Sequence, residues 1–170
     1  MKTASALTKS HPREPARQSA YERDFYAWLL TQVSALRERR FSDLDLENLI
    51  EEVEDLARSI PREIRNRLKV VLVHLLKWQF QPSKRSTSWE VTLLEQRDQL
   101  EQLLEQNPSL RRQVPDLIQR AYATAGKIAG KEMKFEKYRW QQLLPPQCPW
   151  TPEQILDNDF LPNPSRSASR

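Results

Sequence analysis

Apolar residues recur along this chain at steps of three and four, which is the period of an α-helix. The first apolar stripe predicts an amphipathic helix over about residues 20–39. Arginines fill its last turn, where they suit the negative end of the helix dipole. The apolar members of the stripe are Phe25, Trp28, Leu29, Val33 and Leu36.

A second stripe begins after Ser42, a residue type that commonly caps a helix N-terminus. Pro61 cannot donate a backbone hydrogen bond, so we expect this helix to break or kink there, with Ser59 as a new cap. Beyond Pro61 the chain is apolar on nearly all sides as far as Phe80, which is typical of a central, buried helix. The apolar residues before the proline are Leu46, Leu49, Ile50, Val53, Leu56 and Ile60.

Two further helices follow, and prolines mark their limits. One begins near Ser88 and stops before Asn107, because a residue that precedes a proline disfavours the helical conformation. The next begins at Ser109 and carries Gly126 and Gly130 on one face. Small residues at this spacing indicate close packing against a neighbouring helix.

A short helix and two polar tails complete the predicted organisation. Thr151 and the Pro-Glu-Gln after it match a helix start, with threonine as the N-cap and proline at the first helical position. Residues 1–19 and 162–170 are polar and cannot bury enough surface to offset the entropy of ordering, so we expect disordered tails. The sequence therefore predicts one all-α domain over residues 20–161, a helical bundle of four to five long helices.

The net charge of +4 is not spread over the predicted domain. Residues 1–19 carry +3 and residues 162–170 carry +2, which leaves −1 between them. A basic protein is a nucleic-acid candidate when its charge gathers on a folded face. Acidic residues precede the best cationic stripe and no aromatic residue interrupts it, so we do not expect the folded body to bind nucleic acid. This stripe is Arg58, Arg62, Arg65 and Lys69.

Composition excludes several classes of protein. With only two glycines, the chain cannot build a glycine-rich phosphate cradle, and with Cys148 alone it can form neither an internal disulfide nor a cysteine-based zinc cage. No apolar run reaches the length of a membrane span, and the N-terminus lacks the apolar region of a signal peptide. We therefore expect a cytoplasmic protein without a membrane anchor.

Four short motifs occur in a fixed order along the predicted domain. They are LIEEVEDL at 49–56, HLLKW at 74–78 followed by Gln81 and Pro82, Arg85 with Ser88, Trp89 and Arg97, and NPSL at 107–110. In this order and spacing, residues 21–161 resemble the bacterial family called domain of unknown function 29, which is common in cyanobacteria. The resemblance implies an all-helical fold. It implies no reaction, because the family has no established one.

Acidic residues gather on the predicted helix before Pro61. Glu51 and Asp55 are four residues apart and therefore lie on one helix face. Carboxylates at this spacing suit a hard cation such as Mg²⁺. Glu132 is a third candidate metal ligand. The alternative is a charged surface that faces solvent or pairs with arginines.

His74 is the only histidine of the predicted folded part, and it follows an apolar run. It is a candidate proton carrier, and Lys77 is a candidate acid–base group or phosphate contact. No second folded histidine is present for a di-iron site, and no glycines are present for a nucleophile elbow. The alternative is a buried structural histidine that is hydrogen-bonded to a carboxylate of the acidic helix.

Cations and aromatic residues gather at the predicted junction of the next two helices. Arg85, Trp89 and Arg97 are candidates for a polar pocket or an anion contact, since arginine forks around oxyanions and tryptophan supplies contact area. The alternative is that the two arginines pair with Glu51 or Asp55 and fix the register of the helices.

Two functions remain open. The first is a protein-interaction module that binds a protein partner and has neither catalytic activity nor a cofactor. This hypothesis predicts an exposed apolar patch on the folded surface. The second is a metal-assisted hydrolase of a phosphate-containing small molecule, with Mg²⁺ on Glu51 and Asp55 and with His74 or Lys77 as the acid–base group. The hydrolase predicts that these side chains converge in one cleft.

Overall fold

The computed structural model describes residues 19–134 and 142–164, and within these ranges it is all-α, with no strand. Four long helices follow one another, as the hydrophobic pattern predicts: α2 (Phe25–Arg37), α3 (Leu46–Phe80), α4 (Thr87–Gln106) and α5 (Val114–Glu132). The shorter elements are α1 (Ala20–Arg23), η1 (Phe41–Asp43), η2 (Pro82–Lys84), η3 (Pro108–Gln113) and α7 (Pro152–Leu156). None of the described helices combines the length and the apolarity that a membrane crossing requires.

The chain divides into two compact units, an N-terminal unit, Met1–Val53, and a C-terminal unit, Glu54–Arg170. The predicted domain, residues 20–161, spans both. Of the two tails for which disorder is predicted, residues 1–18 and 165–170 lie outside the described residues.

The helix predicted over residues 20–39 is divided at Asp24 in the N-terminal unit. Ser19 and Glu22 form a capping box at the start of α1. The Ser19 hydroxyl accepts from the backbone N–H of Glu22, and the Glu22 carboxylate accepts from the backbone N–H of Ser19. The Asp24 carboxylate accepts a hydrogen bond from the backbone N–H of Ala27 at 3.0 Å. It thereby satisfies a free donor in the first turn of α2, which is the physical reason for a new helix at this point.

Trp28 is the main buried side chain of the N-terminal unit. Its Nε1 donates to the Asp45 carboxylate at 3.1 Å, and the backbone N–H of Asp45 donates to the buried Gln32 side chain at 2.8 Å. Asp45 also accepts from the backbone and side-chain amides of Asn48. Asp45 therefore caps the start of α3, whereas Ser42, the predicted cap, lies in η1.

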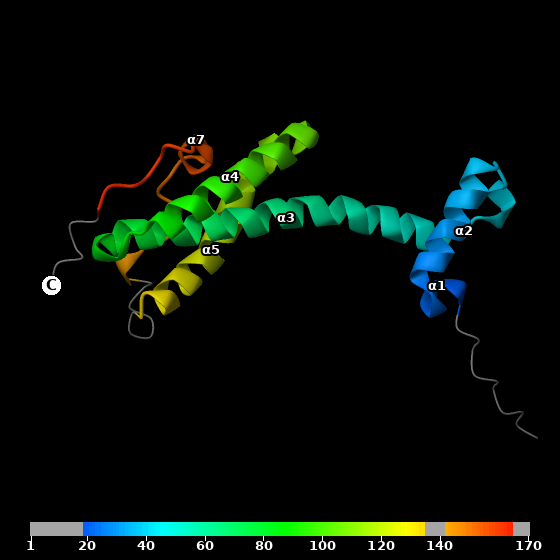
Figure 1. The fold of residues 1–170 in the computed structure, drawn as a ribbon, viewed down its shortest axis with the longest axis horizontal. Coiled ribbons are helices and arrows are strands. Elements are labelled where there is room, and N and C mark those ends of the chain that lie inside the picture. Colours follow the sequence, from blue (N-terminus) through cyan, green and yellow to red (C-terminus); the bar gives the residue numbers. More distant parts are fainter. Residues whose placement is uncertain (1–18, 135–141, 165–170) are drawn as a thin grey trace, which may run out of the picture. The chain divides into compact units, whose positions relative to one another are not determined.

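Helix α3 continues through Pro61, contrary to the predicted break (Figure 1). Ser59 does not cap a new helix, because its hydroxyl donates to the Leu56 carbonyl at 2.7 Å inside the same helix. A proline in a helix removes one backbone hydrogen bond and crowds the carbonyl four residues earlier, at a cost of about 3 kcal/mol. Ile64 and Leu68, in the turns that follow, are completely buried, so packing holds the helix on this side of the proline.

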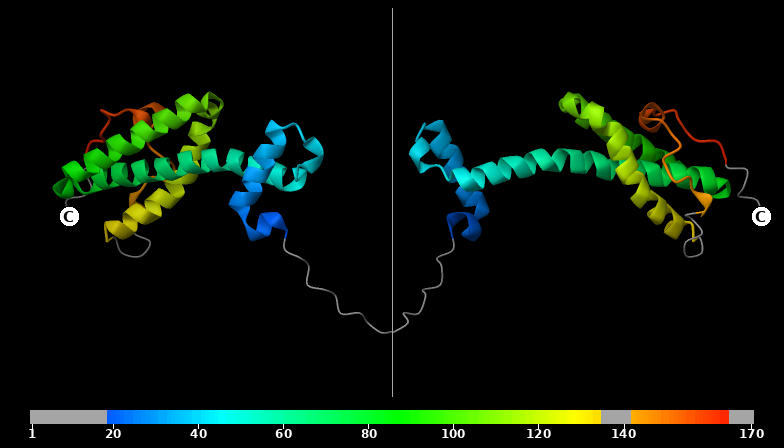
Figure 2. Two further views of the ribbon diagram at one scale, coloured as in Figure 1. Left: turned by 45° about the vertical axis from the view of Figure 1, so that its right-hand side comes forward. Right: turned by 180° about the vertical axis from the view of Figure 1, so that it is seen from behind.

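The C-terminal unit has one hydrophobic core, to which the second half of α3, α4 and α5 all contribute (Figures 1 and 2). Gly126 and Gly130 are both buried on α5, which agrees with the close packing predicted from their spacing. The capping box predicted at Thr151 begins α7, which buries Ile155. Core residues without solvent exposure include Ile64, Leu68, Leu72, Leu76, Leu100, Leu104, Ala125 and Ala129.

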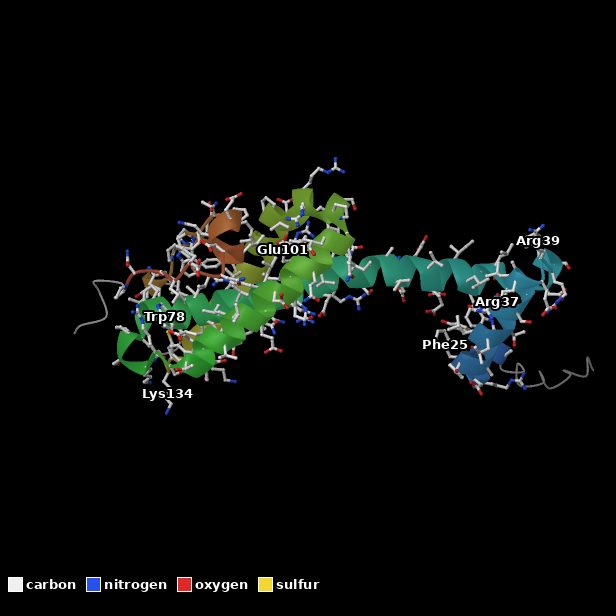
Figure 3. The ribbon with its side chains drawn as sticks, turned by 45° about the horizontal axis from the view of Figure 1, so that its top comes forward. Phe25, Arg37, Arg39, Trp78, Glu101 and Lys134 are labelled. Carbon is white, nitrogen blue, oxygen red and sulfur yellow. The ribbon has the colours of Figure 1, made fainter. Side chains whose placement is uncertain are left out.

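Helices α2 and α5 are followed by non-glycine residues in the left-handed region, Arg39 with φ 58° and Lys134 with φ 56° (both labelled in Figure 3). Glycine is the usual residue at such positions, because it has no Cβ to clash. Both glycines of this chain lie inside α5 instead. The low glycine content therefore coincides with backbone strain at these two helix ends.

Candidate functional site

Four of the predicted site residues meet near the C-terminal end of α3, where they form what we call the Lys77 cluster. Lys77 Nζ donates to the Glu132 carboxylate at 2.7 Å and lies 4.5 Å from the ring centroid of Trp89. The His74 ring meets Trp89 edge-on, with 6.5 Å between the ring centroids. The cluster thus joins His74 and Lys77 of α3, Trp89 of α4 and Glu132 of α5.

The contacts of the Lys77 cluster are typical of a structural arrangement. The Lys77 side chain is only 13% exposed, and both the carboxylate and the aromatic ring stabilise its charge. His74 Nδ1 donates to the Val70 carbonyl at 2.9 Å, so its hydrogen-bond partner is the backbone of its own helix. The predicted partner was a carboxylate of the acidic helix. Burial lowers the pKa of His74, and the hydrogen bond to Val70 opposes this shift.

We expect the free energy of unfolding to decrease as the pH falls below about 6.5, the ordinary pKa of histidine. Burial places the pKa of His74 lower in the folded chain than in the unfolded chain. The unfolded chain therefore takes up the proton first on acidification, and unfolding becomes more favourable. Urea unfolding between about pH 7.5 and about pH 5 measures this slope. The slope should be smaller in His74→Gln, and equal slopes in the two proteins would contradict the burial of His74.

The three metal candidates, Glu51, Asp55 and Glu132, do not form a metal-binding group. Glu51 is exposed, and Glu132 is the partner of Lys77. Asp55 is also exposed and accepts two hydrogen bonds from Arg58, at 2.6 and 3.0 Å. Across the part of the chain that the structure describes, no three His, Cys, Asp or Glu side chains are grouped so that they could hold a metal ion.

The distance along α3 also separates Asp55 from the candidate acid–base groups. Asp55 and His74 lie more than five turns apart on one helix, about 28 Å at 1.5 Å per residue. Metal-assisted hydrolysis needs the metal ligands and the acid–base group to face one substrate. Asp55 and His74 therefore cannot serve a single small molecule in this arrangement.

Arg85 contacts Trp78 and not an acidic residue of α3. Its Nε donates to the Trp78 carbonyl at 3.0 Å, and its guanidinium lies 4.7 Å from the centroid of the Trp78 ring. Trp78 is buried near the end of α3 (labelled in Figure 3). The predicted alternative of a pair with Glu51 or Asp55 is therefore wrong for Arg85, which fixes the end of α3 against the loop that follows.

Arg97 holds the C-terminal segment of the described chain against α4. This arginine is only 2% exposed. It donates from Nε to the Ile155 carbonyl at 2.9 Å, from Nη1 to Asn158 at 3.3 Å and from Nη2 to Phe160 at 2.9 Å. Burial lowers the pKa of Arg97, and the nearby charge of Asp157 opposes this shift. The guanidinium of an arginine nevertheless remains charged. These three carbonyls occupy Arg97, and the predicted pair with Glu51 or Asp55 is wrong here too.

A further group of polar side chains lines a surface pocket of about 250 Å³ between α3 and α5, partly open to solvent, which we call the cationic pocket. Arg65 and Lys69 belong to the cationic stripe seen in the sequence, whereas Arg120 and Thr124 were not recognised as site residues. The sequence signal that could have pointed to Arg120 and Thr124 is their spacing of four residues, which Arg65 and Lys69 share and which places each pair on one helix face. The pocket is lined by Arg65, Asn66, Lys69, Arg120, Ala121 and Thr124.

Large apolar side chains lie exposed on the N-terminal unit, with exposed fractions from 46% to 70%. Leu46, Ile50 and Val53 follow one another at steps of four and three, so they form one stripe on α3. Phe25 is labelled in Figure 3. We call this set the N-terminal apolar surface; its members are Phe25, Tyr26, Leu30, Leu36, Phe41, Leu46, Ile50 and Val53.

The described residues define a small all-α protein with structural ion pairs, a cationic pocket and an exposed apolar surface. The family model of the domain of unknown function DUF29 matches residues 20–161, so this chain belongs to the DUF29 family. The family drawn from the four motifs is therefore confirmed. No curated protein matches the chain, and no solved structure does.

Proposed function

We propose that this chain is a cytoplasmic protein-interaction module without catalytic activity, and that its partner binds the N-terminal apolar surface. The observation that carries the proposal is the exposure of the eight large apolar side chains of this surface. Scattered single apolar residues are normal on a protein surface, whereas contiguous ones, such as the stripe of Leu46, Ile50 and Val53 on α3, are typical of an interaction site.

The small size of the N-terminal unit supports this proposal. Its described part, residues 19–53, has only three buried residues, Trp28, Gln32 and Ala35. A unit of this size cannot build a large core of its own. Burying a large apolar side chain contributes roughly 1.5–3 kcal/mol, so a partner that covers part of this surface gains substantial binding free energy.

The charges around the α3 stripe indicate which kind of partner fits. Residues 46–53 include Glu47, Glu51 and Glu52 and no basic residue. An apolar stripe flanked by carboxylates suits an amphipathic helix that carries lysines or arginines beside its apolar face. A second copy of the chain would bring like charges together, which disfavours self-association through this stripe.

We expect the double variant Ile50→Ser and Val53→Ser to lose its partner when the tagged chain is used for affinity capture from its native host. The side chains are 59% and 64% exposed, so the substitutions remove contact area without opening a core. Mass spectrometry identifies the captured protein, and its Kd for the purified chain should rise at least about tenfold in the variant, which corresponds to about 1.4 kcal/mol.

The matched control for this capture is Val91→Ser and Leu94→Ser on α4, where the side chains are 56% and 55% exposed. This variant should keep the partner. Equal retention by both double variants would contradict the assignment of the N-terminal apolar surface. A captured partner whose contacting segment is acidic or non-helical would contradict the proposed basic amphipathic helix. Such a partner would still support an interaction module.

The metal-assisted hydrolase has less support from the geometry. Asp55 is engaged by Arg58, Glu132 by Lys77, and His74 by its own helix backbone. The Lys77 cluster brings four predicted residues together, but its carboxylate and ammonium neutralise each other. We therefore propose the interaction module alone.

A further inference from the structure

We propose that the cationic pocket of the C-terminal unit binds the phosphate group of a small phosphorylated molecule. The pocket shares no residue with the N-terminal apolar surface. The proposal therefore adds a ligand to the chain and goes beyond the proposed function.

Two helices each line the pocket with a pair of polar residues at a spacing of four. Arg65 and Lys69 are four residues apart on α3, and Arg120 and Thr124 are four residues apart on α5. Residues at this spacing lie on one helix face, and Asn66 adds a third polar side chain from α3. Ala121 is 2% exposed between the α5 pair, and its small side chain leaves space between the helices.

No carboxylate of the described residues neutralises the positive charges of the pocket. Five other basic residues form ion pairs with carboxylates: Arg40, Arg58, Arg67, Lys77 and Arg111. Within the described residues, Arg65, Lys69 and Arg120 form no ion pair, and no acidic residue lines the pocket. Three like charges around one hollow repel one another, and a bound anion converts this repulsion into attraction.

The donors of the pocket match a phosphate group. A guanidinium can donate two parallel hydrogen bonds to phosphate oxygens, and an ammonium adds a compact charge. Lys69 Nζ donates to the Asn66 side-chain oxygen at 3.3 Å, which leaves the Asn66 amide nitrogen to donate. The Thr124 hydroxyl is a further donor. Three cations suit a doubly charged phosphate better than a singly charged carboxylate.

The shape of the site favours a compact ligand over a nucleic-acid chain. Binding of a polymer requires a continuous cationic track. The stripe predicted from the sequence is not such a track, because Arg58 is paired with Glu54 and Asp55, and Arg62 does not line the pocket. A hollow of about 250 Å³ accommodates a phosphate or a pyrophosphate with a small organic group.

Isothermal titration calorimetry on the full chain tests the proposal with three probes: inorganic phosphate, pyrophosphate and adenosine monophosphate. We expect saturable binding of at least one probe at one site per chain, at constant ionic strength in a chloride buffer. Lys69→Gln and Arg120→Gln should each weaken this binding at least about tenfold, because each variant loses a charge-assisted hydrogen bond. Lys131→Gln, on α5 and exposed but outside the pocket, should leave the Kd unchanged.

Thermal unfolding without ligand separates a binding role from a structural one. The Arg120→Gln chain should melt at the same temperature as the wild type or higher, since the substitution relieves repulsion between cations. A lower melting temperature would indicate that Arg120 supports the fold. The proposal is overturned if none of the three probes binds at millimolar concentration, or if Lys131→Gln weakens binding as much as Arg120→Gln. Binding of an RNA or DNA oligonucleotide, but of none of the three probes, would also overturn it.

Discussion

We expect Arg97→Met to lower the free energy of unfolding by about 4 kcal/mol. The Arg97 guanidinium is buried and donates to three carbonyls of the C-terminal segment, those of Ile155, Asn158 and Phe160. Hydrogen bonds to a charged group each contribute about 1.5–3 kcal/mol, and buried carbonyls that lose their donor carry a desolvation penalty. Methionine fills part of the volume but donates nothing. Urea unfolding measures the loss.

The control for Arg97 is Arg111→Met. Arg111 pairs with Glu101 (labelled in Figure 3) at 2.6 Å, and the two side chains are 47% and 48% exposed. An exposed pair of this kind contributes about 0–1 kcal/mol. Limited proteolysis adds a local readout, because Arg97→Met should open cleavage sites after α7 that the wild type protects. If Arg97→Met lowers the free energy of unfolding no more than Arg111→Met does, the three hydrogen bonds of Arg97 do not hold the C-terminal segment.

Leu72→Ala is the second substitution with a large expected effect, a loss of about 2–5 kcal/mol in the free energy of unfolding. Leu72 has no solvent exposure and belongs to the core that α3, α4 and α5 share. Alanine leaves a cavity there that the surrounding helices fill only in part. Denaturant unfolding at constant pH measures the change, and the m-value should stay the same if the folded state stays compact.

Leu56→Ala is the matched control, with the same substitution on the same helix. Leu56 is 66% exposed, and leucine and alanine have similar helix propensities, so we expect a change within about 0.5 kcal/mol. A cost for Leu56→Ala as large as that for Leu72→Ala would contradict the exposure of this part of α3.

Pro61 shows why one sequence-based prediction failed. The break was expected from local chemistry, because a proline removes a backbone donor. The helix continues because the turns after the proline, which include Ile64 and Leu68, are fixed by the core of the C-terminal unit. The free-energy cost of the missing backbone donor is confined to Pro61. The packing that outweighs this cost comes from residues of α4 and α5.

The sequence offered candidate site residues but not the contacts that they make. The structure brings His74, Lys77, Trp89 and Glu132 together from three different helices, a grouping that the sequence did not predict. The partners of Arg97 could not be predicted, because they are backbone carbonyls beyond α7 and every residue type has a carbonyl.

The sequence by itself determined the helices and most of their ends. Hydrophobic spacing predicted α2 to α5, and the proline after Asn107 and the capping box at Thr151 marked boundaries that the structure confirms. The predicted start at Ser109 is wrong, because Ser109 lies in η3 and α5 begins at Val114. These features are local, since a helix satisfies its backbone within the segment and its caps act within one turn.

Only the tertiary structure decided which apolar and polar faces are covered. Leu56 and Leu72 belong to similar stripes on α3, yet one is exposed and the other is completely buried. Likewise, Arg65 and Arg120 share a pocket only because α3 and α5 pack together. Periodicity shows that a helix has an apolar face, but burial depends on which neighbour covers that face, and such contacts join residues far apart in the sequence.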